Sequence, residues 1–437
     1  MGNYFHSVTL DEEKCRGCTN CIKRCPTEAI RVRKGKARII KERCIDCGEC
    51  IRICPQHAKK AISDDFSCIS SYKYKIAIPA PSLYSQFKPE YSVKKLLNAL
   101  KLVGFDDVFE VARAAEFVTE ETKKLLSSGT AKKPMISSAC PAVVRLIQVR
   151  FPNLIDNLVK LDSPMEVAAR FIKKKTAMEK KLDLSDIGVF FITPCAAKVT
   201  SVKAPYEHQN TFVDGAISIK DIYLKILSKL EKADESGDLA KAGFEGIQWA
   251  NPGGECLGLG TDRFLAVDGI HNVITILEAI ENDKLDGVDF IEALSCTGGC
   301  LGGPLTVENL YVAKTKLKKH IDDAKKYGKN NAIPDGYEDD IAWTGNLVYK
   351  PIMKLDDDLG MAMKKLESLE KINKELPGLD CGACGAPSCR ALAEDIVRGM
   401  ASETDCIFKL RERVRDLAAQ MVELEGKIPP VMDRDQE

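Results

Sequence analysis

The sequence predicts an α/β core with mainly parallel sheets, placed between an α+β cysteine-rich domain and a small, mainly helical one. Short apolar runs alternate with helical periods between residues 75 and 296, which is typical of parallel strands covered by helices. A cysteine motif occurs twice near the N-terminus, and a cysteine group with different spacing lies near the C-terminus. A length of 437 residues is enough for about three domains of ordinary size.

Composition narrows the class of protein. Lys+Arg and Asp+Glu number 64 each, so no overall field attracts nucleic acid or an anionic membrane. We find no run of eighteen apolar residues for a membrane span and no cleavable leader, so we expect a cytoplasmic protein. In a reducing compartment, 18 cysteines at regular spacings indicate metal binding rather than disulfides.

The N-terminal motif is an internal repeat of the form C-x2-C-x2-C-x3-C-P, "CRGCTNCIKRCP" followed by "CIDCGECIRICP". This spacing is that of bacterial two-cluster ferredoxins, in which the fourth cysteine of each copy binds the other four-iron cluster. We therefore assign Cys15, Cys18, Cys21 and Cys54 to one cluster, and Cys44, Cys47, Cys50 and Cys25 to the second. Zinc is the alternative, but it prefers two separated C-x2-C pairs. The repeat predicts electron transfer.

The C-terminal group has the spacing C-x2-C-x4-C-x16-C and consists of Cys381, Cys384, Cys389 and Cys406. Glycines at 382 and 385 let the backbone fold closely around sulfur, and the segment "ALAEDIVRGMA" predicts a helix that returns the chain to Cys406. The group resembles the small iron-sulfur module of some membrane redox complexes and corrinoid iron-sulfur proteins. That resemblance favours a further four-iron cluster, with zinc as the alternative.

The core predicts a cleft where its strands end. We expect strands in "KIAIPA", "DDVFEVA", "PMISSAC", "IGVFFITPC", "FLAVDGI" and "VDFIEALSC". Cys140, Cys195 and Cys296 each fall at the C-terminal end of such a strand, where α/β proteins place their sites. We expect these thiols to converge on one cleft.

Three segments of the core resemble the signatures of iron-iron hydrogenases. "SSACP" is similar to Thr-Ser-Cys-Cys-Pro, "TPCAAK" to Met-Pro-Cys-Thr-Ala-Lys, and "EALSCTGGC" to Glu-x-Met-Ala-Cys-Pro-Gly-Gly-Cys. With the two-cluster repeat, the resemblance covers residues 1 to about 320. It implies a hydrogenase core of two lobes around a cleft. The expected divisions are 1–66 for the ferredoxin-like domain, 67–330 for the core, 331–374 for a connector and helix, 375–410 for the cluster module and 411–437 for a helical tail.

The resemblance also implies a cofactor, the H-cluster, which is a four-iron cubane joined to a two-iron subsite with carbonyl, cyanide and azadithiolate ligands. Its implied ligands are Cys140, Cys195, Cys296 and Cys300, the last also bridging to the subsite. Lys198 would donate a hydrogen bond to a cyanide, and the other implied contacts are Ser138, Thr193, Pro194 and Ser295. The alternative makes Lys198 an ordinary helix-start lysine and Cys195 a buried core thiol.

The sequence departs from the family pattern at the proton relay. Ala139 stands where hydrogen-evolving members have a cysteine that passes protons to the cluster, and alanine carries no proton. Thr193, Leu294 and Thr297 replace two methionines and a proline of the signatures, so we expect a more polar pocket. Glu255 and Cys256, in "NPGGECLGLG", are a candidate alternative relay. A surface turn with an incidental cysteine is the interpretation that we favour for this loop, and Cys68 is expected to be a packing residue.

The last helix and the lost relay predict a use for the cluster. Leu410, Val414, Leu417, Met421 and Leu424 form an a/d seam that would pair with a second copy or a signalling protein, or pack on its own domain. We expect a hydrogen sensor with slow turnover that passes electrons through its ferredoxin clusters. The alternatives are a catalytic ferredoxin-linked hydrogenase and an iron-sulfur assembly homologue without the two-iron subsite. Implied partners are H2, protons, a ferredoxin and hydrogenase maturation proteins, with no nucleic acid or membrane span.

Overall fold

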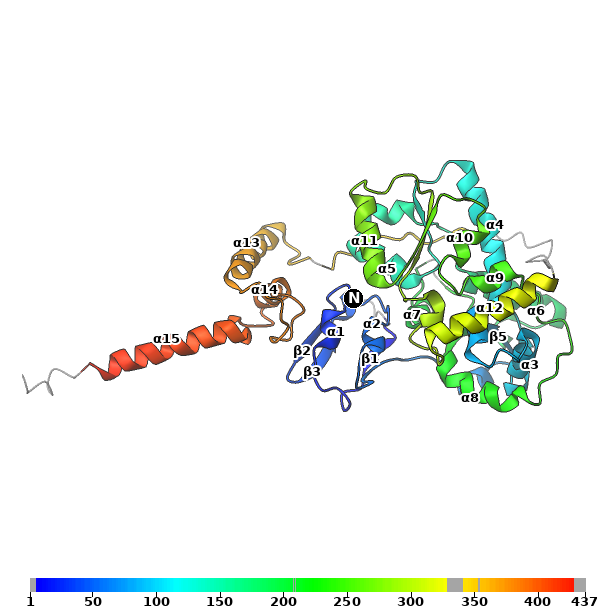
Figure 1. Ribbon diagram of the computed structural model, residues 1–437, viewed down its shortest axis with the longest axis horizontal. Helices are drawn as coiled ribbons and strands as arrows, with labels where there is room; N and C mark the ends of the chain where they lie inside the picture. Colours follow the sequence, from blue (N-terminus) through cyan, green and yellow to red (C-terminus); the bar gives the residue numbers. More distant parts are fainter. Residues whose placement is uncertain (1–4, 207, 209, 328–340, 353, 428–437) are drawn as a thin grey trace, which may run out of the picture. The chain divides into compact units, whose positions relative to one another are not determined.

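The computed structural model describes residues 5–206, 208, 210–327, 341–352 and 354–427 (Figure 1). The chain divides into two compact units, one made of Met1–Asp11 and Lys41–Pro351, the other of Glu12–Ile40 and Ile352–Glu437. The first repeat of the cysteine motif therefore belongs to the second unit, and the second repeat belongs to the first.

A four-stranded parallel sheet forms one half of the first unit. Its strands, in spatial order, are β6 (Asp107–Val108), β5 (Tyr74–Pro79), β8 (Ile187–Thr193) and β9 (Gly215–Ser218). All seven residues of β8 are buried, as expected for the continuous apolar run of a central parallel strand. The helices of this half are α3 (Val93–Val103), α4 (Val111–Ser128), α6 (Pro164–Lys180), α7 (Ala196–Lys203) and α8 (Ile219–Leu230).

Both faces of this sheet are covered. Val189 and Phe191 of β8 belong to one hydrophobic cluster, which includes residues of α4 and α6. Phe190 and Ile192 belong to another, which includes residues of α3 and α8. Successive residues of a strand point to opposite faces, so one apolar run fills both cores and fixes the position of the loop that follows it.

A second parallel sheet has the order β10 (Phe264–Asp268), β11 (Phe290–Leu294) and β7 (Met135–Ile136). The remaining helices of the core are α5 (Pro141–Arg150), α9 (Phe244–Gln248), α10 (Gly254–Gly258), α11 (Ile270–Glu281) and α12 (Leu310–Tyr327). All strand pairings within both core sheets of the described chain are parallel, which confirms the mixed helix and strand content and the parallel character expected for the core.

Two strand predictions need correction. The segment 106–112 was expected to be a strand, but it forms only the two residues of β6 before α4 begins at Val111. Acidic residues interrupt the apolar run there, and its last residues form the start of α4. Strand β9 was missed, because its four residues, GAIS, are too short to show a period.

The two cysteine repeats fold alike. In the first unit, β1 (Val8–Leu10) pairs antiparallel with β4 (Lys59–Ala61), and α2 spans Glu49–Arg52. In the second unit, β2 (Ile30–Arg33) pairs antiparallel with β3 (Lys36–Ile39), and α1 spans Asn20–Lys23. Two equivalent positions of each motif have left-handed backbones, which let the loop turn around its cysteines. They are Gly17 and Thr19 in the first motif and Asp46 and Gly48 in the second.

The second unit also contains three C-terminal helices, α13 (Leu359–Glu375), α14 (Cys389–Val397) and α15 (Ile407–Glu425). The helices expected for "LGMAMKKLESLEKINKEL", for "ALAEDIVRGMA" and after Cys406 are confirmed. Part of the expected connector, residues 331–340, and the tail "IPPVMDRDQE" lie outside the described residues.

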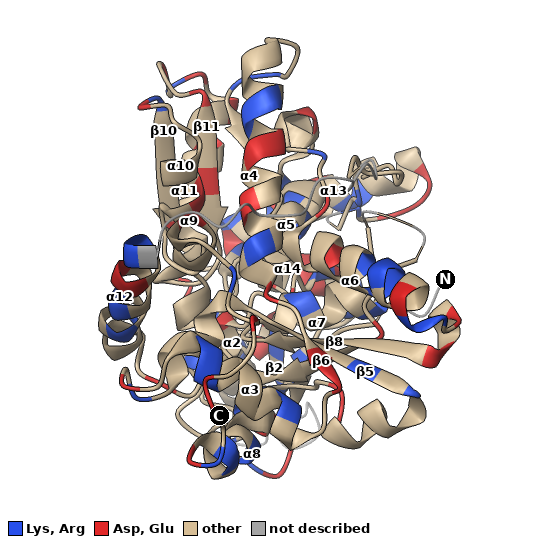
Figure 2. Cartoon of the chain, turned by 90° about the vertical axis from the view of Figure 1, so that its right-hand side faces the viewer, with Lys and Arg blue, Asp and Glu red and all other residues tan. Residues whose placement is uncertain are grey.

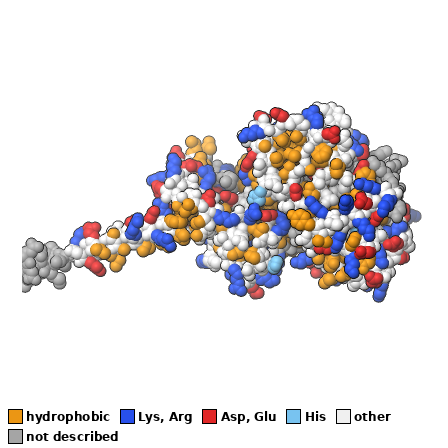
Figure 3. Space-filling model, viewed as in Figure 1, with side chains coloured by type: hydrophobic (Ala, Val, Ile, Leu, Met, Phe, Trp, Pro, Cys, Tyr) orange, Lys and Arg blue, Asp and Glu red, His pale blue; other side chains and the backbone are white. Residues whose placement is uncertain are grey.

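The seam of α15 is exposed. The exposed fractions of its side chains run from 45% at Leu417 to 64% at Leu424, and Figure 3 shows hydrophobic side chains along this helix. The alternative that this seam packs on its own domain is therefore wrong for the described residues. Figure 2 shows basic and acidic residues interspersed along the helices of the face it presents. Within the described chain, no helix is long and apolar enough to cross a membrane.

Candidate functional site

The cysteines of the core lie where parallel strands end. Cys195 follows β8 and precedes the first residue of α7, and Cys140 stands in the same way before α5, shortly after β7. Cys296 follows β11 by two residues, and Cys300 lies in the short 3-10 helix Gly299–Gly302. Two sheets therefore contribute thiols from three strand ends, as the sequence predicts.

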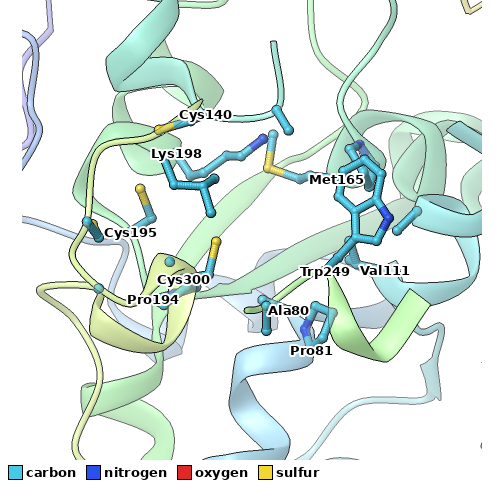
Figure 4. Close-up of a pocket in the computed structure, with 18 of the residues that line it drawn as sticks. Ala80, Pro81, Val111, Cys140, Met165, Pro194, Cys195, Lys198, Trp249 and Cys300 are labelled. Atoms are coloured by element: carbon cyan, nitrogen blue, oxygen red, sulfur yellow. The ribbon is translucent and has the colours of Figure 1, made fainter. Parts of the chain in front are cut away.

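All four thiols line one cavity, together with Lys198 (Figure 4). In Figure 4 the side chain of Lys198 extends from α7 into the same space that Cys140 and Cys300 face. Most of the wall is apolar, and neither Thr193 nor Thr297 lines it, so the substitutions do not make the pocket more polar as expected. The apolar lining residues include Ala80, Pro81, Val111, Ala115, Met165, Phe191, Trp249 and Leu294.

Glycines bring the backbone of the third signature close to its surroundings. Gly298 and Gly299 have φ of 77° and 67°, and a Cβ on Gly298 would lie 2.1 Å from Leu310 Cδ1. A Cβ on Gly303 would lie 2.4 Å from the carbonyl oxygen of Pro194. The turn that carries Cys296 and Cys300 back to one site therefore depends on glycine.

Burial raises the pKa of three of these thiols, those of Cys195, Cys296 and Cys300. Desolvation, and then the neighbouring Cys296 and Cys140, raise the pKa of Cys195 to about 12. Cys300 faces the open cavity, yet protein surrounds its sulfur, and burial raises its pKa well above the usual range. Thiols with raised pKa values bind as thiolates only when a cation displaces their protons. The donor set therefore fits an iron-sulfur cluster, whose iron supplies that positive charge.

The other predicted cofactor contacts divide into two groups. Pro194 and Ser295 line the cavity with Lys198, and the Ser295 hydroxyl is 3.8 Å from the Cys296 sulfur. Thr193 and Ser138 do not line it. The Thr193 hydroxyl accepts a hydrogen bond from the Cys195 amide at 3.1 Å, and the Ser138 hydroxyl donates to the Leu161 carbonyl at 3.4 Å. These two residues shape the loops beneath the cavity.

A buried carboxylate pair lies on the wall near Ala139. Glu255 and Glu292 both line the cavity, and the Ser137 hydroxyl donates to Glu255 at 2.7 Å. Burial, and then the charge of Glu292, raise the pKa of Glu255, and burial also raises that of Glu292. The pair therefore retains a proton under conditions in which a surface carboxylate has lost it.

The surface-turn interpretation of this loop is wrong. Glu255 is 5% exposed and Cys256 is fully buried. The amides of Gly253, Glu255 and Cys256 donate to the Glu292 carboxylate at 3.0–3.1 Å, so a carboxylate of β11 holds the whole loop inside the core. Sequence reasoning missed Glu292, although its place two residues before the Leu294 position marks it as part of the third signature.

A cation of the second cysteine repeat contacts one of the cavity cysteines. Arg52 Nη1 donates to the Cys296 sulfur at 3.2 Å, and Arg52 Nη2 pairs with Glu49 at 2.6 Å. A Cβ on Gly48 would lie 2.6 Å from Pro304 Cγ, so the repeat packs directly on the loop that follows Cys300. Sequence reasoning missed Arg52, because nothing in the motif "CIRICP" shows that this side chain faces the core.

The repeats themselves fit iron-sulfur ligation. The amide of Ala29 donates to the Cys25 sulfur at 3.2 Å, and the amide of Ala58, at the equivalent place, donates to the Cys54 sulfur at 3.3 Å. Hydrogen bonds from backbone amides to sulfur stabilise thiolate ligands. The pairing of these cysteines into two sets of four stays a prediction.

The C-terminal cysteines also fit a cluster. Cys384, Cys389 and Cys406 belong to one hydrophobic cluster, and Cys381 and Cys406 are close enough to raise the pKa of Cys384 after burial. Gly382 and Gly385 have φ of 78° and 80°, as their predicted role requires. Cys68 lies partly buried against the core that includes α3.

Two curated proteins illustrate what the chain resembles. It is 22% identical over 303 residues to iron hydrogenase 1 of Clostridium pasteurianum, covering 56% of this chain and 53% of that protein. It is 29% identical over 213 residues to the periplasmic Fe hydrogenase large subunit of Nitratidesulfovibrio vulgaris, covering 44% and 51%. The chain spans about half the length of these relatives. A solved FeFe-hydrogenase from Chlamydomonas reinhardtii matches 64% of this chain and 95% of its own, with a TM-score of 0.48 and 15% identity.

Family models match three parts of the chain. Residues 7–55 match a 4Fe-4S dicluster domain, and residues 376–408 match an Fe-S cluster family. Residues 73–241 and 241–304 match the model described as iron only hydrogenase large subunit, C-terminal domain, which accounts for more than half of the chain. The chain is therefore an iron-sulfur protein that belongs to the iron-only hydrogenase large subunit family.

Proposed function

We propose that this protein is a hydrogen-sensing iron-iron hydrogenase. It slowly and reversibly oxidises H2 and reduces protons at an H-cluster, and passes electrons through ferredoxin-type four-iron clusters to a regulatory output. The two parallel sheets are the two lobes of its core. The observation that carries the proposal is the single cavity lined by Cys140, Cys195, Cys296, Cys300 and Lys198.

The cavity residues have separate tasks. The four cysteines would hold the cubane of the H-cluster. When bound, the two-iron subsite supplies the metal at which H2 is split or formed. Lys198 donates to an anionic ligand inside an apolar wall, where a charge-assisted hydrogen bond is strong because water does not compete. The apolar wall keeps water away and leaves room for a small apolar gas.

Slow turnover follows from Ala139. This residue lies on the cavity wall and has no group that exchanges a proton. A positioned proton donor contributes about a hundredfold or more to rate, so its absence favours a site that binds H2 and reports it over one that turns it over.

The output side of the proposal uses the remaining modules. Arg52 ties the second cysteine repeat to Cys296, which favours electron exchange between the cavity and the ferredoxin-type clusters. The exposed seam of α15 suits a second copy of the chain or a signalling protein. A ferredoxin is the expected redox partner, hydrogenase maturation proteins would install the subsite, and the cytoplasm is the expected location.

One observation favours a second candidate, a catalytic ferredoxin-linked hydrogenase. The carboxylates of Glu255 and Glu292, with the Ser137 hydroxyl, offer a proton route to the cavity that does not use position 139. The third candidate, an assembly homologue that keeps only a cubane, is disfavoured by Lys198 and by the paired Cys296 and Cys300.

Infrared spectroscopy tests the proposal. The protein is reconstituted with a synthetic two-iron azadithiolate complex, and spectra are recorded under argon and then under H2, with turnover assayed on the same sample. Carbonyl and cyanide bands that shift reversibly with H2 while turnover stays slow are expected for a sensor. Fast turnover would make the protein an enzyme, and the absence of bands would remove the hydrogenase function.

A further inference from the structure

Within the second unit, the two cysteine-bearing segments touch through their own cluster loops. The amide of Val32, on β2, donates to the Gly385 carbonyl at 2.8 Å, and Arg33 Nη1 donates to the Cys384 carbonyl at 2.8 Å. Lys23, two residues after Cys21, donates to the Pro387 carbonyl at 3.0 Å. The loop that carries Cys384 therefore adds to the edge of the strand that follows the first cysteine repeat.

The approach is as close as backbones allow. A Cβ on Gly385 would lie 1.9 Å from the Val32 carbonyl oxygen, and a Cβ on Gly382 would lie 2.9 Å from Lys23 Cε and 3.5 Å from Ile22 Cδ1. Both glycines stand next to a cluster cysteine, as Ile22 stands next to Cys21. A side chain would be crowded at either glycine, so residues beside the C-terminal ligands lie directly against the first cysteine repeat and the strand that follows it.

Buried charge holds the two segments together. Arg31 Nε and Arg33 Nη2 both donate to Asp395 Oδ2, at 2.7 and 2.8 Å, and Asp395 is 2% exposed. The Ser388 hydroxyl donates to Glu28 at 3.1 Å. Removing one partner of a buried ion pair is costly because the other charge is left without compensation, so this contact is a permanent part of the fold rather than a transient docking.

We propose that the C-terminal module is a built-in redox partner of the first ferredoxin repeat, exchanging electrons directly between the cluster on Cys381, Cys384, Cys389 and Cys406 and the cluster bound by Cys15, Cys18 and Cys21. Electronic coupling falls steeply with separation, so contact between ligand loops favours direct transfer. In each step one cluster loses one electron and the other gains it, with no proton moved and no bond broken. Cys381 is exposed, which places the end of this route within reach of an external acceptor.

The inference goes beyond the proposed function, because it requires the four-iron clusters and not the two-iron subsite. It is therefore tested on protein without that subsite, reduced chemically with dithionite, so that its failure is independent of any result with H2. Two reduced four-iron clusters held close together are paramagnetic neighbours, and their electron paramagnetic resonance (EPR) signals should be split and broadened by spin-spin interaction.

The experiment compares the fully reduced native protein with Cys389→Ser, with cluster content checked by iron analysis and Mössbauer spectroscopy. We expect splitting in the native protein beyond that of the ferredoxin clusters alone, and loss of this extra splitting in Cys389→Ser. A native spectrum equal to that of Cys389→Ser plus an isolated cluster would overturn the proposal.

A second pair of variants tests the contact itself. Asp395→Ala should lose the extra splitting while it keeps its iron, whereas Asp416→Ala, an exposed carboxylate on α15, should keep both. Unchanged splitting in Asp395→Ala would show that the ion pair is not what holds the clusters close together. Should Asp395→Ala fail to fold, the comparison with Cys389→Ser still decides the proposal.

Discussion

The core cavity and the C-terminal module use thiols in opposite ways. The cavity collects Cys140, Cys195, Cys296 and Cys300 from three strand ends, and each is held by a sheet that is complete without a cluster. The C-terminal module collects its cysteines from one short segment, and three of them are part of its small hydrophobic core. We therefore expect the cavity to stay folded without metal, and the C-terminal module to need its metal in order to fold.

The largest expected effect tests the cavity. Cys195→Ala should abolish the infrared bands of metal-bound carbonyl and cyanide in reconstituted protein, because one ligand of the cubane is lost. The core should stay folded, and the EPR signal of the C-terminal cluster should be unchanged. Cys68→Ala, a partly buried thiol outside the cavity, is the matched control and should keep all bands. Bands at full intensity in Cys195→Ala would refute the ligand assignment.

Iron removal tests the other half of the comparison. Chelation should open residues 376–408 to hydrogen-deuterium exchange, because the small module loses the ligands that join its loops. Strands β5 and β8 should keep their protection under the same conditions, since their apolar residues are buried independently of metal. Equal protection of the module with and without iron, measured by mass spectrometry, would show that its helices fold alone.

The comparison also explains how far the sequence could predict the sites. The spacing of the C-terminal cysteines and of the repeats predicts iron-sulfur ligation directly, because each motif lies within a short stretch of chain. The cavity ligands lie up to 160 residues apart, between positions 140 and 300, and only the strand ends and the family signatures brought them together. The parallel character of the core followed from long apolar runs such as β8.

Other parts of the site were not predictable. Glu292 lies in an apolar strand, and the strand pattern alone gives no sign of its role. That role follows from the three hydrogen bonds that its carboxylate accepts from backbone amides of the loop around Glu255. Arg52 reads as an ordinary surface arginine in a ferredoxin motif, and its contact with Cys296 depends on how the repeat packs on the core. Contacts between distant segments leave no local pattern.

The carboxylate pair gives the next effect. Glu292→Gln should lower H2 turnover by roughly a hundredfold if the pair carries protons, since general acid-base groups contribute about that much or more. The exposed Glu120→Gln on α4 should leave turnover unchanged. Turnover equal to that of the unmodified protein, measured with the cluster bands intact, would exclude this route.

The same variant should change the dependence of stability on pH. Burial raises the folded-state pKa of Glu292 above the usual range of a carboxyl group, so its contribution to stability is present below that usual range and is lost as pH rises through the raised pKa. Glutamine stays neutral, so thermal unfolding of Glu292→Gln should lose less stability between acidic and alkaline pH. A parallel decline in both proteins would contradict the assigned direction of the shift.

Restoring the relay has a smaller expected effect. Ala139→Cys should raise turnover about tenfold, because it returns an exchangeable proton to the cavity wall while any route through Glu255 continues to operate. Ala139→Ser, of similar size, separates an effect of volume from an effect of the thiol. No increase in Ala139→Cys, with the infrared bands verified, would count against the missing relay as the cause of slow turnover.

The smallest effect concerns Arg52, the residue through which the second repeat touches the cavity. Its cation and its hydrogen bond to the Cys296 sulfur would stabilise the more negative, reduced form of the proposed cubane. Arg52→Met keeps an unbranched apolar stem and removes both the cation and the hydrogen bond, so the potential of the cubane should fall by roughly 50 mV, where 59 mV is a tenfold change for one electron. Lys60→Met, which removes an exposed cation of the same unit, should shift it far less. An EPR-monitored redox titration that gives equal potentials for both variants would show that the contact has only a structural role and does not affect the reduction potential of the cubane.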